Sequence, residues 1–232
     1  MFNPPHLFLF LNVKTILIFL QVVLFSSCVT VNYVDNIIPI TQKHHVIAVV
    51  PPRVTLERKI WMSDDNFKEI TLKKQTKLHD QLVRSFQRRI NEGRCFVEVL
   101  DPNATAYLAF SDGYNEGRIP PKELCKLLKV DAVLTTSIQI LEPVSEFTAI
   151  FFQQTSGTTL VTNSIVLNAS LVDTLGTSPI FTLNAFKNGT LGSVKEVMLN
   201  KIIRRTTRNT PYNTKKNPYR KLYKSYLLNK VN

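Results

Sequence analysis

The stretch PPKELCKLLKVDAVLTTSIQ, residues Pro120–Gln139, predicts a helix that leads directly into a strand. Pro121 suits the first turn of a helix, because the N–H that proline lacks would have no partner there. Leu124, Leu127 and Leu128 follow as the apolar residues of that helix. Residues 130–141 are then rich in β-branched side chains, which favour a strand.

Upstream of this stretch, two further strands are predicted. Residues 46–50 form a continuous apolar run, which is typical of a strand covered on both faces. Pro51 and Pro52 are expected to end it. Residues 96–100 alternate enough to predict a second strand, which Asp101 and Pro102 would end.

A long amphipathic helix is predicted between these two strands. Apolar residues recur at helical spacing from Phe67 to Ile90. Asp64 or Asp65 is expected to cap its start, and Gly93 its end. Most basic residues fall elsewhere on the cylinder and are expected to form a solvated face rather than an anion site. They are Lys73, Lys74, Lys77, Arg84, Arg88 and Arg89.

Downstream, the pattern predicts an antiparallel pair and a last helix. Apolar and polar residues alternate over residues 159–173, as in a strand with one covered face. Residues 175–177 supply a turn, and residues 180–186 predict the return strand. A final helix is expected to begin at Ser193.

The order of these elements predicts an α/β or α+β domain over residues 46–203. It would contain a single mixed β-sheet with packed helices, built as β-α-β-α-β followed by an antiparallel hairpin and a C-terminal helix. The flanking segments are expected to be a signal peptide over residues 1–27, a tether over residues 28–45 and a basic, disordered tail over residues 204–232.

The amino-terminal segment resembles the export signal of bacterial lipoproteins. Residues 16–25 are apolar apart from Gln21, and Ser26, Ser27 and Cys28 follow. In such signals the cysteine thiol receives a diacylglycerol and becomes the first mature residue, so Cys28 is the expected lipid attachment site. The alternatives are an uncleaved amino-terminal anchor and an incidental cysteine. Val29 stands where aspartate would signal inner-membrane retention, so the resemblance implies a periplasm-facing position on the outer membrane.

The net charge of +12 is concentrated at the C-terminal end. Residues 201–232 contain ten basic residues and no acidic one, with Tyr212 and three later tyrosines between them. Such a tail either keeps the chain soluble or contacts an anionic surface. A periplasmic location argues against nucleic acid as the partner. The residues that would make the contact are Arg204, Arg205, Arg208, Lys215, Lys216, Arg220, Lys221 and Lys224.

Two other groups of residues are candidates for sites. Cys95 and Cys125 would pair as a disulfide in an oxidising compartment, or else lie buried as small apolar residues. Phe147, Ile150 and Phe151 recur at i, i+3 and i+4 and are predicted to contact a membrane or a partner.

Motifs for catalysis or for a cofactor are missing from the sequence. It has no Gly-x-Ser-x-Gly elbow, no phosphate-binding glycine loop and no Cys-x-x-Cys. His44 and His45 are adjacent in the expected tether, and no cysteine or carboxylate stands at metal-ligand spacing from them. The carboxylate pairs Asp64 with Asp65 and Glu116 with Glu123 are interpreted as a helix cap and surface residues. We therefore expect no enzyme, no metal and no cofactor.

Two stretches resemble hallmark segments of small envelope lipoproteins of Gram-negative bacteria. They are VIAVVPPRVTLER, residues Val46–Arg58, and the opening stretch, Pro120–Gln139. The plan is similar to the curli-secretion lipoprotein family, the TolB amino-terminal domain and the lipoproteins that activate penicillin-binding proteins. Lys129 stands where glycine is common in that group, and residues 51–53 replace its usual Leu-Pro-Phe. Asp131 is interpreted as a turn residue that binds its own backbone.

The expected function is that of a lipid-anchored, non-catalytic envelope protein that binds a partner protein or its own copies in assembly or secretion. One alternative is a subunit of an oligomeric secretion channel resembling the curli exporter. Residues 147–152 and 159–173 would then be the candidate membrane-inserting strands. Another alternative is a cell-wall hydrolase.

Overall fold

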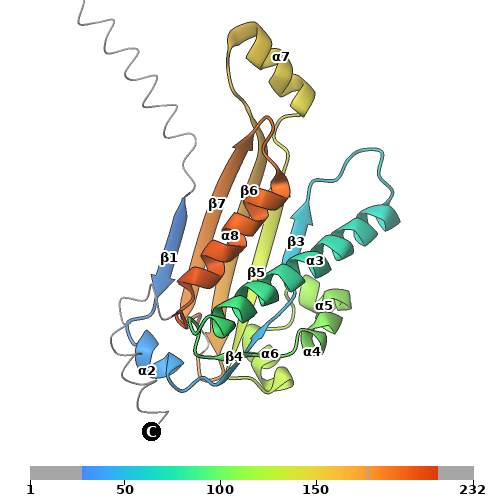
Figure 1. Ribbon diagram of the computed structural model, residues 1–232. Helices are drawn as coiled ribbons and strands as arrows, with labels where there is room; N and C mark the ends of the chain where they lie inside the picture. The colour runs from blue at the N-terminus through green and yellow to red at the C-terminus, as the bar shows by residue number, and fades with distance from the viewer. Residues whose placement is uncertain (1–27, 177, 214–232) are drawn as a thin grey trace, which may run out of the picture.

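The computed structural model describes residues 28–176 and 178–213. Within these residues one mixed sheet of seven strands has the order β1-β7-β6-β5-β2-β4, with β3 also paired to β5 (Figure 1). The predicted class, one mixed sheet with packed helices, is confirmed. The strands are β1 (Val29–Tyr33), β2 (Val46–Val49), β3 (Arg53–Leu56), β4 (Glu98–Val99), β5 (Ala132–Leu141), β6 (Val161–Asp173) and β7 (Phe181–Thr190).

Helices pack on both faces of this sheet. Leu82 of the long helix α3 and Ile202 of the last helix α8 share a buried cluster with Leu134. Val133 points to the other face, where it joins Leu124 of α6. The helices are α2 (Ile37–Thr41), α3 (Asp64–Asn91), α4 (Asn103–Ala106), the 3-10 helix η1 (Tyr107–Phe110), α5 (Asp112–Asn115), α6 (Pro121–Leu128), α7 (Glu146–Ser156) and α8 (Lys195–Asn209). Among the described residues no helix combines the length and the apolar character needed to cross a membrane.

Strand β5 holds the parallel and the antiparallel halves of the sheet together. One edge of β5 pairs in parallel first with β2 and then with β3, and the other edge pairs antiparallel with β6. Pro51 and Pro52 end β2 as expected, but β3 resumes the same edge three residues further along β5. The prolines are tolerated because they lie in a bulge. Between β2 and β3 the chain has one residue more than the facing part of β5.

The antiparallel pair follows the predicted alternation. Residues 132–141 of β5 pair with residues 173–164 of β6, and β6 pairs in turn with β7. Ile165, Leu167 and Leu171 of β6 are buried in the cluster under α3 and α8, whereas Asn168 is exposed on the other face. The period of two therefore fixes which face of the hairpin enters the core.

The N-cap of helix α3 precedes both predicted caps and lies one residue before Asp64. Ser63 is the N-cap, and its hydroxyl accepts the Asn66 N–H at 3.4 Å. Asp64 and Asp65 lie instead in the first turn, where their charges favour the positive end of the helix dipole. The helix ends at Asn91, and Gly93 follows with a φ of 61°, as its predicted role requires.

The expected tether over residues 28–45 is wrong. Residues 29–33 form strand β1, which pairs antiparallel with β7 at the edge of the sheet. Val29 and Val31 pack against the core cluster, and Ile37 of α2 is buried in it. Residues 29–33 stay paired with the sheet because their alternating valines supply the apolar face that an edge strand needs.

The predicted start of the tail at residue 204 is also wrong. Helix α8 continues to Asn209, because Thr206 and Thr207 are buried against the body of the domain. Tyr212 is buried too, with its hydroxyl 2.6 Å from Nδ1 of His44 and its ring edge-to-face with Phe96. The predicted signal peptide, residues 1–27, and five basic residues of the predicted tail lie outside the described part of the chain. The five are Lys215, Lys216, Arg220, Lys221 and Lys224.

Lys129 shows why glycine is favoured at its position in the hallmark segment. It is the C-cap of α6 and has a φ of 52° and a ψ of 47°, a left-handed conformation. In the part of the chain that the structure describes, Lys129 is the one non-glycine residue with a positive φ. A side chain in this region costs about 1 kcal/mol, which glycine avoids.

We expect Lys129→Gly to raise the free energy of unfolding by about 0.5–1 kcal/mol, because it removes the left-handed strain. Lys126→Gly, in the interior of the same helix, is the matched control and is expected to lower it by about 1 kcal/mol. Urea unfolding of the two variants measures both changes. A Lys129→Gly variant less stable than the parent would contradict this interpretation of the turn.

Candidate functional site

Cys28, the expected lipid attachment site, is exposed at the edge of the sheet. Its carbonyl oxygen accepts the Phe186 N–H at 2.9 Å, and β1 begins at the next residue. No flexible linker therefore separates this cysteine from the folded domain. Lipid attachment itself stays a prediction, and the structure adds that it would fix the acyl chains to a defined place on the domain.

Helix α7 projects beyond the ends of β5, β6 and β7 (Figure 1). The Ser145 hydroxyl accepts the Thr148 N–H at 3.1 Å and caps the start of the helix. At the other end, Gly157 has a φ of 68° and its N–H donates to the Gln153 carbonyl at 3.1 Å. Local capping thus defines α7, since Ala149 is its only buried side chain.

The apolar side chains of α7 lie on the surface. Phe147 is 81% exposed and Phe151 is 55% exposed, and Ile150 and Phe152 are also classed as exposed. The Phe151 and Phe152 rings are edge-to-face with centroids 6.0 Å apart. We call these four residues the α7 cap. The structure thus brings together the three residues predicted from helical spacing, and it adds Phe152, which the spacing alone did not include.

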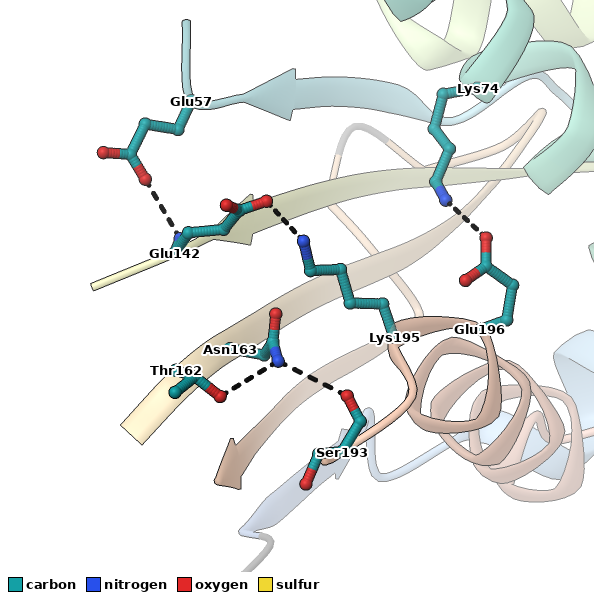
Figure 2. A network of polar contacts seen from close by, with 8 residues as sticks. All are labelled: Glu57, Lys74, Glu142, Thr162, Asn163, Ser193, Lys195 and Glu196. Carbon is teal, nitrogen blue, oxygen red and sulfur yellow. Dashed lines mark hydrogen bonds and ion pairs between the residues drawn. The ribbon is translucent and has the colours of Figure 1, made fainter. Parts of the chain in front are cut away.

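A network of polar contacts holds the strand ends from which α7 projects (Figure 2). Glu142, which follows β5 directly, forms an ion pair with Lys195, and its N–H donates to the Glu57 carboxylate at 3.0 Å. The hydrogen bond from Lys195 holds the pKa of Glu142 below its usual value. Asn163 of β6 donates to the Ser193 carbonyl at 3.4 Å.

The same network reaches α3. Lys74 of α3 lies 3.2 Å from the carboxylate of Glu196, the residue after Lys195. These groups are partly exposed, so each contact stabilises the fold by at most about 1 kcal/mol. Together they connect β3, β5, β6, α3 and the start of α8 (Figure 2). The polar contacts therefore hold in place the strand ends that carry the α7 cap.

The two segments expected as membrane-inserting strands have other places in the fold. Residues 147–152 belong to helix α7. Most of residues 159–173 form β6, the strand between β5 and β7, and its inward side chains pack under the helices. Neither segment is a free strand in the described structure.

Of the two alternatives expected for Cys95 and Cys125, the structure shows the second, because both cysteines are free and buried. Cys95 belongs to the cluster that contains Leu134, whereas Cys125 belongs to the cluster that contains Val133. Successive residues of a strand point to opposite faces, so the two thiols are on opposite sides of the sheet. Burial raises the pKa of each thiol to about 11, so both stay protonated at neutral pH.

His44 and His79 are buried inside the domain. Nε2 of His79 lies 2.9 Å from the Val49 carbonyl oxygen, which can only accept, so this nitrogen carries the proton. His44 is not in a tether but is buried against Tyr212. Within residues 28–176 and 178–213, no group of three histidine, cysteine or acidic side chains lies close enough to hold a metal ion.

Asp131 binds the start of β2 and not its own turn, which corrects its predicted role. Its carboxylate accepts the N–H groups of His45 at 2.6 Å and Val46 at 2.9 Å. Burial alone would raise the pKa of Asp131, but the two N–H bonds outweigh it and hold the pKa below its usual value. This residue of the hallmark segment therefore fastens β2 beside β5.

Comparison with known proteins finds similar solved structures but no sequence family. No protein-family model matches the chain, and no curated protein matches it. A PelC dodecamer from Paraburkholderia phytofirmans has 8% identity and a TM-score of 0.41, covering 78% of this chain and 94% of that one. Lipoprotein GNA1162 from Neisseria meningitidis has 14% identity and a TM-score of 0.37, with coverages of 71% and 96%. A hypothetical protein from Chlamydia trachomatis has 16% identity and a TM-score of 0.38, again with coverages of 71% and 96%. Similarity at these values does not extend to site residues.

The buried histidines predict how stability depends on pH. Burial lowers the pKa of both His44 and His79 from the usual 6.5. Below about pH 6.5 the unfolded chain therefore binds protons that the folded chain does not, and stability falls as the pH falls. Each histidine contributes a slope of up to about 1.4 kcal/mol per pH unit.

We expect His79→Gln to lose less stability than the parent between pH 7 and pH 5, because glutamine can donate to Val49 but does not titrate. Thermal unfolding at several pH values measures the slope. Gln87→Asn, at an exposed position of α3, is the control and is expected to keep the parent slope, because it removes no titrating group. Equal slopes for the parent and His79→Gln would show that His79 does not stay neutral in the folded protein.

Proposed function

We propose that this chain is a lipid-anchored, non-catalytic envelope protein whose α7 cap binds a partner protein or a second copy of the chain during assembly or secretion. The α7 cap is the observation that supports this most directly. It places four large apolar side chains on one eleven-residue helix that the described chain leaves uncovered. Aromatic side chains in such a position are typical of protein interfaces.

The charge of α7 favours a protein partner over a lipid surface. Helices that lie on membranes usually carry lysine and arginine on their polar side. Helix α7 has no basic residue, and its one charged residue is Glu146. Its other polar residues are neutral, among them Gln153 and Gln154. A neutral surface of this kind gains little from anionic headgroups but can be buried against another protein.

The proposed anchor is set apart from the α7 cap. Cys28 lies level with Phe186, four residues before the end of β7 at Thr190. At a rise of about 3.4 Å per residue, the sheet extends about 14 Å beyond the anchor before α7 begins. The acyl chains on Cys28 would hold the protein on the periplasmic side of the outer membrane. The cap would then stay available to another protein.

The energetic contribution of the cap can be estimated from its side chains. Full burial of one phenylalanine or isoleucine contributes about 1.5–3 kcal/mol. Loss of a single ring from the contact therefore weakens binding about tenfold or more, since about 1.4 kcal/mol corresponds to a factor of ten. The same substitution changes the fold little, because the rings are exposed in the free chain.

The test is a photo-crosslinking amino acid at Phe147 in intact cells, with adducts identified by mass spectrometry. We expect an adduct with one defined protein or with a second copy, and Phe151→Ser is expected to reduce its yield about tenfold. The melting temperature of Phe151→Ser should stay within about 2 °C of the parent.

Leu175→Ser is the matched control. Leu175 is 77% exposed but lies in the β6–β7 turn, at the other end of the sheet. This variant is expected to keep the parent adduct. The proposal is contradicted if the crosslinker captures only lipid or nothing, or if Leu175→Ser reduces the adduct as much as Phe151→Ser does.

A further inference from the structure

The C-terminal half of α3 and the facing side of α8 form a basic groove of about 400 Å³. We call it the arginine groove. Its one carboxylate is Glu92, which is paired with Arg94 at 2.8 Å. Six guanidinium groups against one carboxylate leave the groove with a large positive charge. The arginines are Arg84, Arg88, Arg89 and Arg94 from α3 and the turn after it, and Arg204 and Arg208 from α8.

Four of these six arginines have no acidic partner. Within the described residues, no carboxylate lies within the 4.0 Å of an ion pair from Arg88, Arg89, Arg204 or Arg208. Arg84 reaches Asp80 at 3.8 Å, at the exposed edge of the groove. The repulsion among these groups is therefore left for solvent or a bound anion to offset.

Two residues that line the groove, Gln81 and Arg94, each have a buried polar atom without a partner in the described structure. Arg89 is buried, and its Nε donates to the Thr207 hydroxyl at 3.2 Å. Nε of Arg94 is buried with no hydrogen-bond acceptor in the described structure. A buried donor without an acceptor is costly, so this atom favours a ligand that can accept. Burial, and next the charge of Arg208, lower the pKa of Arg89.

A second hollow of about 520 Å³ extends the arginine groove toward the proposed anchor. It shares Arg204 and Arg208 with the groove and adds Lys201. Its other side is Val29 and Val31 of β1, the strand that begins directly after Cys28. At about 3.4 Å per residue, these valines lie within about 10 Å of Cys28 along the chain.

We propose that the arginine groove binds the phosphate groups of anionic lipid headgroups in the membrane that holds Cys28. Arginine is suited to this ligand, because its planar group can donate two parallel hydrogen bonds to phosphate oxygens. The second hollow connects the groove to Val29, the residue next to Cys28, so the acyl chains would bring headgroups close to it at high local concentration. This inference rests on the proposed lipid anchor and deepens it.

The bound headgroups would also orient the domain. Contact through α3 and α8 turns that side of the sheet toward the bilayer, while α7 projects along the strands from the end of the sheet (Figure 1). The described basic residues predicted to contact an anionic surface, Arg204, Arg205 and Arg208, thus lie on a folded helix and not on a tail. Each of them lines one or both hollows.

The test measures binding to the full chain purified in a non-ionic detergent. Isothermal titration with dihexanoyl phosphatidylglycerol, dihexanoyl phosphatidylcholine and inorganic phosphate compares the three ligands. We expect phosphatidylglycerol and phosphate to bind, and phosphatidylcholine to bind at least tenfold more weakly. The double variant Arg88→Gln with Arg208→Gln is expected to weaken phosphatidylglycerol binding at least tenfold.

The matched control removes the same charge elsewhere. Lys122→Gln with Lys126→Gln on α6 is expected to change affinity less than twofold, because α6 packs on the other face of the sheet. Equal loss in both double variants would show unspecific attraction and overturn the site. Phosphate binding without phosphatidylglycerol binding would overturn the lipid assignment. The assay needs neither the anchor nor a partner, so its failure is distinct from failure of the crosslinking test.

Discussion

The antiparallel pairing of β1 with β7 decides where the proposed anchor lies relative to the other proposed surfaces of this protein. Residues 29–33 pair with residues 185–181, and the Cys28 carbonyl extends the ladder by one bond to Phe186. Because β1 is held at the edge of the sheet, its valines lie under α8 and form one side of a basic hollow. Without this pairing, Cys28 would be on a loose segment, and the proposed anchor would not fix the domain relative to a membrane.

Long periodic segments of the sequence predict their structure well, and short ones do not. A long segment repeats its apolar residues often enough to show the period of a helix or of a strand. Examples are the helix and strand of residues 120–141 and the alternating residues of β6. Strands β1 and β3 have five and four residues, and each stands beside a signal that suggests something else. For β1 that signal is the expected lipid attachment site at Cys28, and for β3 it is the proline pair. In both cases pairing with a longer strand decides the structure.

The candidate sites also differ in how well the sequence predicts them. The α7 cap is visible in the sequence, because its residues are neighbours on one helix. The arginine groove is not, since it joins residues 84–94 to residues 204–208, and only the contact between α3 and α8 brings them together. Taken separately, the first group suggests a solvated helix face and the second a disordered tail. Spacing in the sequence could not decide between a disulfide and two buried thiols for Cys95 and Cys125, because it cannot show that the sheet lies between them.

The proposals together describe one arrangement: acyl chains at the sheet edge, cations beside them, and an apolar helix held away from both. All of it depends on modification of one thiol that the fold places next to β1. Mass spectrometry of the mature amino terminus, recovered from cell membranes, tests this most directly. We expect Cys28 as the first residue, carrying a diacylglycerol on its sulfur. An unmodified Cys28, or a chain that retains residues 1–27, would contradict the account.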